Sequence, residues 1–245
     1  MAKESMALIC ENKKIAPDTY RMRLKSDLCE EIHCGQFVQV LVPGYFLRRP
    51  ISVCEVCGDE IILVYRIVGD GTKEMARMKE GMRLSLLGPL GNGFPEEGGD
   101  VLLIGGGLGT PPLIEAAKTV IRHKGKATAV LGFNDKASEI LVGRFREIGC
   151  EVYIATMDGS DGTRGTVMDA IRENGLNAQT VYACGPAMML KAVSETFDNG
   201  FVSLESRMGC GFGTCMGCVV KDKEGHSMRV CHEGPVFPIG KVVIE

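Results

Sequence analysis

The chain has 245 residues, of which 45% are hydrophobic and 24% charged, an ordinary composition for globular domains. Its 28 Lys and Arg against 31 Asp and Glu give a net charge of -3, which excludes a strongly basic surface for nucleic acid or anionic lipid. No apolar run reaches the roughly 18 residues of a membrane span, and the first residues lack the apolar core of a signal peptide. We therefore expect a cytoplasmic protein that binds neither nucleic acid nor membrane.

The first hundred residues predict short antiparallel strands. In residues 19–25, Tyr20, Met22 and Leu24 alternate with charged side chains, which is the period of a half-buried strand. Further strands are expected over 36–42, 52–56, 61–68 and 81–87, with a hairpin turn at 57–61 and a short helix over 72–79. Short strands with regular turns favour a barrel.

Two motifs in this region offer ligands for a phosphorylated cofactor. Arg48-Arg49-Pro50-Ile51-Ser52 begins a strand, where an arginine fork can bind pyrophosphate and a serine hydroxyl can reach a ring nitrogen. Thr72 follows a strand that ends in glycines and is expected to cap a helix whose free N–H groups attract an anion. Basic residues beside proline are also common on surfaces, so neither motif decides the matter alone.

The pattern changes at Gly98-Gly99. Residues 100–104 form a continuous apolar run, as expected of a strand buried on both faces. From there predicted strands and helices alternate, which indicates a parallel, doubly wound α/β sheet. The strands are expected over 100–104, 127–133, 151–157 and 180–184, and the helices over 111–124, 137–148, 165–173 and 187–197.

Loops at the ends of these strands suggest a nucleotide site. The glycine loop 105–110 lies between a buried strand and a helix, the context of dinucleotide binding, although it is not G-x-G-x-x-G. Asp158 ends the third strand, where an acidic residue holds a ribose hydroxyl and favours NAD over NADP; a plain turn residue is the alternative. Cys184-Gly185-Pro186 follows the last strand, and Cys184 has a buried core thiol as its alternative.

Four of the eleven cysteines are grouped near the C-terminus. Cys210, Cys215, Cys218 and Cys231 are spaced C-x4-C-x2-C-x12-C, the arrangement of a plant-type 2Fe–2S cluster. The interspersed glycines allow backbone N–H groups to approach bridging sulfides. A structural zinc site is the alternative, but zinc more often takes two short cysteine pairs. The other seven cysteines are expected to be small buried hydrophobes.

These sites predict a chain of electron carriers. NAD(H) exchanges a hydride, an iron–sulfur cluster exchanges single electrons and a flavin does both, so the flavin lies between the other two. No Ser/His/Asp set or carboxylate pair suggests a separate organic substrate site. We therefore expect the substrate site on a partner chain. Changes in the sequence pattern divide the chain into an FAD-binding β-barrel domain (1–98), an NAD-binding α/β domain (99–202) and a 2Fe–2S module (203–245).

The motifs, in this order, resemble the ferredoxin–NAD(P)+ reductase superfamily. The resemblance implies FAD contacts at Arg49, Pro50, Ile51, Ser52, Arg66, Ile67, Val68, Gly71 and Thr72. It implies NAD contacts at Gly105, Gly106, Gly107, Gly109, Thr110, Asp158, Gly185 and Pro186. Cys184 would be a catalytic residue near nicotinamide and flavin. Ile51 departs from the pattern, because the superfamily usually has a flavin-stacking tyrosine there; Tyr45 and Tyr65 are the candidates to replace it.

A narrower resemblance covers essentially the whole chain. R-R-P-I-S, G-G-G-x-G-x-P-P, S-L-E-x-x-M-x-C-G and the closing C-x-x-G-P-V-F over 231–237 resemble the electron-transfer subunits of heteromeric NAD-dependent dihydroorotate dehydrogenases. The resemblance implies a catalytic partner with FMN that oxidises dihydroorotate to orotate in pyrimidine biosynthesis, with two copies of each chain. The alternatives are the small subunit of a ferredoxin- or sulfide-linked NAD(P)H oxidoreductase, a stand-alone flavin reductase and a zinc-stabilised nucleotide-binding module.

Overall fold

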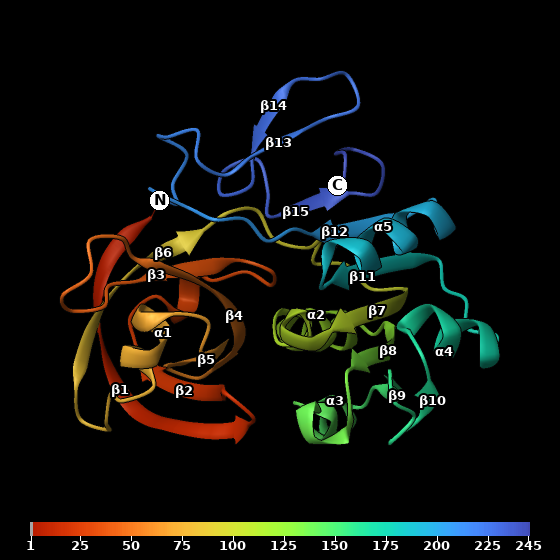
Figure 1. Cartoon of the computed structure of the whole chain (residues 1–245), viewed down its shortest axis with the longest axis horizontal. Helices are drawn as coiled ribbons and strands as arrows, with labels where there is room; N and C mark the ends of the chain where they lie inside the picture. The colour runs from red at the N-terminus through yellow and green to blue at the C-terminus, as the bar shows by residue number, and fades with distance from the viewer. Residues whose placement is uncertain (1) are drawn as a thin grey trace.

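The first part of the chain is a closed six-stranded antiparallel barrel. A computed structural model describes residues 2–245 and places the barrel on the left of Figure 1, in red to yellow. In barrel order the strands are β1 (Lys3–Ala16), β2 (Thr19–Lys25), β5 (Glu60–Arg66), β4 (Arg49–Cys57), β3 (Phe37–Val40) and β6 (Arg83–Leu90). Closure pairs β1 with β6, so the barrel has no free edge. Helix α1 (Asp70–Met75) follows β5 and buries Met75 in the barrel core.

The second part is a seven-stranded sheet between two layers of helices. Its order is β10-β9-β8-β7-β11-β12-β15, and all neighbouring pairs are parallel except β12 with β15. The strands are β7 (Asp100–Gly106), β8 (Lys126–Phe133), β9 (Glu151–Thr156), β10 (Thr163–Arg164), β11 (Thr180–Cys184), β12 (Gly200–Ser203) and β15 (Val236–Pro238). The helices are α2 (Pro112–Arg122), α3 (Val142–Ile148), α4 (Val167–Glu173) and α5 (Ala187–Thr196). The strand order reverses between β7 and β11, which is where open α/β sheets bind their ligands.

The C-terminal region lies across both parts, in blue at the top of Figure 1. It contains the hairpin of β13 (Val219–Lys221) and β14 (Ser227–Arg229) and then returns β15 to the edge of the sheet. The Asn92 N–H after the barrel donates to the Gly234 carbonyl at 2.6 Å. Strand β12 crosses the predicted boundary at residue 202, so the C-terminal region is joined to the sheet. The three-part division of the chain stays a prediction.

The predicted fold class is confirmed, with two corrections to its helices. The predicted helix over 137–148 is wrong in length, because Leu141 has φ 62° and separates a 3-10 turn (Lys136–Ser138) from α3. The predicted helix over 72–79 is wrong in its bounds, because α1 runs over Asp70–Met75 and is capped by Gly69, so Thr72 is its third residue. The Thr72 hydroxyl still accepts from the Val68 N–H at 2.9 Å.

No helix within residues 2–245 combines the length and the apolar character that crossing a lipid bilayer requires.

Candidate cofactor cavities and cysteine loop

A cavity of about 760 Å³ opens between the barrel and the segment that follows β12. This volume is within the usual range of small-molecule sites. Seven of the nine residues predicted to contact FAD line it, namely Arg49, Pro50, Ile51, Ser52, Arg66, Val68 and Thr72. Ile67 and Gly71 do not belong to its lining. The motifs at the starts of β4 and α1 therefore meet at one cavity, although they are separated in sequence.

Gly71 has no side chain, which leaves space for Arg49 beside the cavity. A Cβ atom at Gly71 would overlap the Arg49 guanidinium, so only glycine allows Arg49 to lie against the start of α1. The guanidinium also lies 4.6 Å from the centre of the Tyr45 ring, a cation–π contact. The arginine is thus held at the cavity wall with its donors near a helix start, as a pyrophosphate site requires.

The structure distinguishes the two tyrosines that could replace the missing stacking tyrosine. The Tyr65 ring is 1% exposed and packs in the barrel core, and its hydroxyl donates to Asn12 Oδ1 at 2.9 Å. Both tyrosines line the cavity, but Tyr45 is the more accessible of the two, since it is half-buried there and contacts Arg49. Tyr45 is therefore the better placed of the two.

A second cavity, of about 630 Å³, lies at the carboxyl ends of the parallel strands. Five of the residues predicted to contact NAD line it, namely Gly106, Gly107, Gly109, Gly185 and Pro186. Gly105 and Thr110 are buried outside its lining. Asp158 is also outside the lining, and its carboxylate accepts from the Ser160 N–H at 2.9 Å and from the Ser160 hydroxyl at 2.6 Å. These two hydrogen bonds, the hydroxyl first, lower the pKa of Asp158, and its contact with NAD stays a prediction.

The loops after β7 and β11 are in direct contact at this cavity. A Cβ atom at Gly109 would overlap the Cys184 carbonyl, and one at Gly106 would lie 2.8 Å from the Pro186 ring. Glycine therefore permits the close approach of the two loops. The Cys184 side chain is 3% exposed and lines neither cavity, and burial raises the pKa of its thiol to about 12. The thiol is thus neutral near pH 7.

Four residues form a wall that the two cavities share: Arg66, Val68, Leu108 and Glu205. The surrounding protein desolvates the Glu205 carboxyl and raises its pKa, and the Arg66 guanidinium partly opposes that shift, while the residue itself is exposed to the open cavity. Leu108 and Glu205 were missed in the sequence analysis as site residues. A signal existed for Glu205, since it follows β12 at the carboxyl edge of the sheet, where ligands bind.

The four grouped cysteines come together beside the β13–β14 hairpin. Cys210, Cys215 and Cys218 lie on the segment 210–218, which we call the cysteine loop, and Cys231 follows β14. Cys218 and Cys231 are buried, and Cys210 and Cys215 are half-buried. The Cys215 N–H donates to Cys210 Sγ at 3.3 Å, and the Cys231 N–H donates to Cys218 Sγ at 3.5 Å. Burial opposes ionisation of Cys210, but backbone N–H groups outweigh it and lower the pKa of its thiol to about 6. Thiolates are the form that binds metal, so the environment of Cys210 suits a ligand, whereas burial and the neighbouring Cys218 raise the pKa of the Cys231 thiol to about 12.

The spacing of the sulfurs bears on the choice between a cluster and zinc. Among residues 2–245, no three of the four sulfurs lie within 4.8 Å of one another, whereas thiolates around one zinc ion are about 4 Å apart. Gly211 and Gly213 have φ angles of +77° and +88°. A Cβ atom at Gly209 or Gly217 would lie 3.4 or 3.5 Å from Cys215 Sγ, an ordinary van der Waals contact, so the space beside that sulfur does not depend on these two glycines. The loop therefore fits a two-iron cluster better than a single zinc ion.

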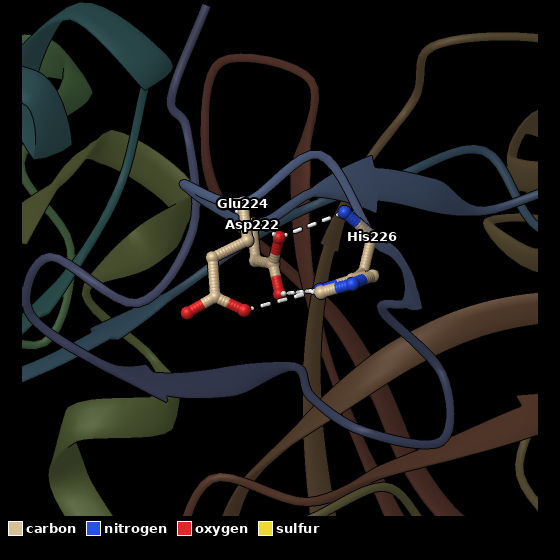
Figure 2. Close-up of side chains that lie close together, drawn as sticks. All are labelled: Asp222, Glu224 and His226. Atoms are coloured by element: carbon tan, nitrogen blue, oxygen red, sulfur yellow. Dashed lines mark hydrogen bonds and ion pairs between the residues drawn. The ribbon is translucent and has the colours of Figure 1, made fainter.

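Another group of possible metal ligands lies on the turn between β13 and β14. Figure 2 shows Asp222, Glu224 and His226 with their ligand atoms close together. Asp222 Oδ1 accepts from the N–H groups of Glu224 and His226 at 2.9 and 2.8 Å, and its other oxygen lies 3.2 Å from His226 Nδ1. These contacts fix the turn, and the Glu224 and His226 side chains are exposed. Turn formation accounts for the group.

Comparison with known proteins identifies the family. Residues 205–243 match the model of the iron–sulfur cluster binding domain of dihydroorotate dehydrogenase B. The electron transfer subunit of dihydroorotate dehydrogenase B (NAD(+)) from Bacillus mycoides is 41% identical over 260 residues, which cover all of both chains. The subunit of the same name from a Geobacillus species is 42% identical, again over all of both chains. The chain belongs to this family.

Solved structures share the fold. A chain in the structure of an NADH-dependent reduced ferredoxin-NADP oxidoreductase has a TM-score of 0.88 and 30% identity, over 97% of this chain and 90% of that one. An Amycolatopsis cytochrome P450 reductase has a TM-score of 0.69 and 26% identity, over 79% of this chain and 65% of that one. The family predicted from the motifs is thus confirmed, and the rival family shares its architecture.

Proposed function

We propose that the chain is the electron-transfer subunit of an NAD-dependent dihydroorotate dehydrogenase and holds FAD and a 2Fe–2S cluster. The observation that carries the proposal is the continuity of the three sites. Four residues line both cavities, and Met208 lines the flavin cavity two residues before Cys210. This continuity supports an NAD site, a flavin site and a cluster site that follow one another within one chain.

Each part of the chain has a role in this arrangement. Arg49 and Ser52 on β4 and Thr72 on α1 hold FAD. The glycine loop after β7, with Gly185 and Pro186, holds NAD(H), and the four grouped cysteines ligate the cluster. When bound, FAD exchanges a hydride with NAD(H) and single electrons with the cluster. Val68 and Leu108, at the shared wall, give the place where the two nucleotides would meet an apolar lining.

The partner is proposed to dock on the cysteine loop. Phe212 and Met216 lie on this loop and are 50% and 62% exposed, although both are large and apolar. Two large apolar side chains exposed on the same loop support this face as the docking surface. We assign to the partner the FMN, the dihydroorotate site and a stoichiometry of two copies of each chain. A cytoplasmic location is part of the proposal, and the eleven cysteines, all free of disulfides, are typical of a reducing compartment.

The experiment measures two reactions separately, the reduction of FAD by NADH and the reduction of NAD+ by dihydroorotate. In the complex with the catalytic subunit, Cys215→Ser should remove NAD+ reduction by dihydroorotate almost completely, while NADH still reduces FAD at the normal rate. Cys57→Ser is the matched control, because Cys57 is an exposed cysteine on the barrel, and it should leave both reactions intact. Equal loss of both reactions in Cys215→Ser would contradict the proposed order of carriers.

The same complex tests the rival function. A ferredoxin- or sulfide-linked oxidoreductase would take its electrons from a larger subunit with further iron–sulfur clusters. Co-purification of the native chain with a protein that contains FMN supports the proposal. Co-purification with a subunit rich in iron–sulfur clusters would replace it with the rival.

A further inference from the structure

Gln39 is a buried polar side chain whose carboxamide has no protein partner. It lies on β3 with 0% of its surface exposed, and within residues 2–245 neither its nitrogen nor its oxygen forms a hydrogen bond. Burial of an unpaired carboxamide is unfavourable, and an apolar side chain of similar shape would avoid the penalty. The position therefore indicates a partner other than the protein itself.

The alternation of β3 directs Gln39 out of the barrel. Val38 and Val40 pack in the barrel core, whereas Phe37 packs in a core that includes Cys218 and Cys231 of the C-terminal region. Successive side chains of a strand point to opposite faces, so Gln39 shares the face of Phe37. It is buried there because the C-terminal region covers this face of the barrel.

The segment that covers Gln39 is the cysteine loop itself. A Cβ atom at Gly211 would overlap the Gln39 carboxamide, and the nearest atom would be Nε2. Gly211 follows Cys210 directly. Gln39 lines neither cofactor cavity. The carboxamide is therefore placed against the backbone of the loop, next to a predicted cluster ligand.

Sulfur is the acceptor that this location supplies. Backbone N–H groups already donate to Cys210 Sγ and Cys218 Sγ, and the sulfurs of a bound cluster carry negative charge that attracts further donors. We propose that the Gln39 carboxamide donates a hydrogen bond to a sulfur of the 2Fe–2S cluster beside Cys210 and raises the reduction potential of the cluster. The inference rests on the cluster assignment made under the proposed function.

The direction of the effect follows from charge. The reduced cluster carries one more negative charge than the oxidised cluster, so an N–H donor stabilises the reduced form more. Gln39 also lies opposite Pro50 in the β3–β4 pairing. The strand pair that presents Arg49 and Ser52 to the flavin cavity thus presents Gln39 to the cluster, and the barrel sets the electronic environment of both carriers.

The test is a redox titration of the full chain with its cofactors, followed by electron paramagnetic resonance. Gln39→Leu should shift the midpoint potential of the cluster to a more negative value and change its g-values. Its FAD content, its iron content and the rate of FAD reduction by NADH should stay at wild-type levels. Gln179→Leu is the matched control, because Gln179 is exposed on a distant loop. An unchanged potential in Gln39→Leu with full iron content would overturn the inference.

A second measurement decides the question if Gln39→Leu does not retain iron. Wild-type chain labelled with ¹⁵N at its glutamine side chains should show a nitrogen hyperfine coupling to the reduced cluster in pulsed paramagnetic resonance. Absence of the coupling would overturn the inference. Wild-type chain that binds no iron at all would instead contradict the proposed function.

Discussion

Gly71 controls how closely Arg49 approaches the start of α1. Its missing side chain leaves the space that the guanidinium occupies, so Gly71→Ala should displace Arg49 from the cavity wall. Loss of one charge-assisted hydrogen bond costs about 1.5 kcal/mol or more, which corresponds to at least about tenfold weaker binding of FAD. The measurement is the dissociation constant of FAD for the reconstituted chain.

Gly143→Ala is the control for this substitution. A Cβ atom at Gly143, in α3, would meet nothing within 4 Å, and alanine is favoured over glycine in a helix. Its FAD affinity should equal that of the native chain. Equal FAD affinity in Gly71→Ala would show that Arg49 does not hold the cofactor.

Glu205 makes the stability of the chain depend on pH. Desolvation by the surrounding protein raises its pKa above the ordinary value of 4.5, so the folded protein binds this proton more tightly than the unfolded chain does, and solvent keeps the effect small because the residue is exposed to the open cavity. The stabilisation that this proton gives the folded protein is fully present below pH 4.5 and is lost as the pH rises through the raised pKa of Glu205. Glu205→Gln should therefore have nearly the native free energy of unfolding at about pH 4 and a higher one at about pH 8. Denaturant titrations at both values measure it, and a difference that is independent of pH would contradict it.

At the scale of elements, a network of ion pairs joins β4 of the barrel to α2 and α3. Glu55 on β4 is 4% exposed and pairs with Arg144 of α3 and, at 3.3 Å, with Lys118 of α2. The Val56 N–H donates to Glu115 at 2.9 Å, and Lys118 donates to the Val56 carbonyl at 2.7 Å. The network fixes the barrel against the sheet, and so fixes the distance between the two cavities.

Arg144→Met tests this network. It leaves the buried Glu55 carboxylate with Lys118 alone, so it should destabilise the chain by about 2 kcal/mol, between the values for exposed and for fully broken buried pairs. Arg172→Met is the matched control, because the Arg172–Asp169 pair is 77% and 40% exposed, and it should change stability by about 0.5 kcal/mol or less. Equal free energies of unfolding for the two variants would show that the network does not stabilise the fold.

Elements with a local signal could be predicted from the sequence, and elements that depend on distant partners could not. The alternation in 19–25 and the apolar run at 100–104 predicted β2 and β7, because burial on one or both faces is visible in the period. β12 and β15 pair only because the C-terminal region returns to the sheet. Neither segment has a sequence pattern that predicts this pairing.

The same distinction applies to the candidate site. The cysteine spacing and the glycine loop predicted their own chemistry, because their ligands lie close together in sequence. The roles proposed for Gln39 and Leu108 could not be predicted from the sequence. Gln39 is an ordinary strand residue and Leu108 a loop leucine, and their surroundings are formed by segments distant in the sequence. Asp158 differs from these two residues. Its position in the sequence predicted a contact with NAD, but its carboxylate accepts a hydrogen bond from the Ser160 hydroxyl.

At the scale of the whole molecule, one hydrophobic core, in addition to the barrel's own core, contains side chains of the barrel, the sheet and the C-terminal region. That core joins Phe37 and Leu90 of the barrel, Leu102 of the sheet, and Cys231 and Phe237 of the C-terminal region. Since Cys231 is a predicted cluster ligand, packing of the core and retention of iron are physically connected. The chain should therefore unfold in a single transition when the cluster is bound.

Phe237→Ala tests whether the core and the cluster depend on each other. Phe237 is 1% exposed, and its truncation should cost about 3 to 5 kcal/mol. Phe145→Ala is the matched control, because Phe145 is 0% exposed but lies in a separate core that contains none of the four grouped cysteines. Both variants should lose similar stability, whereas only Phe237→Ala should release iron faster to a chelator under native conditions. Equal release rates would mean that the cysteine loop holds its metal independently of the fold around it.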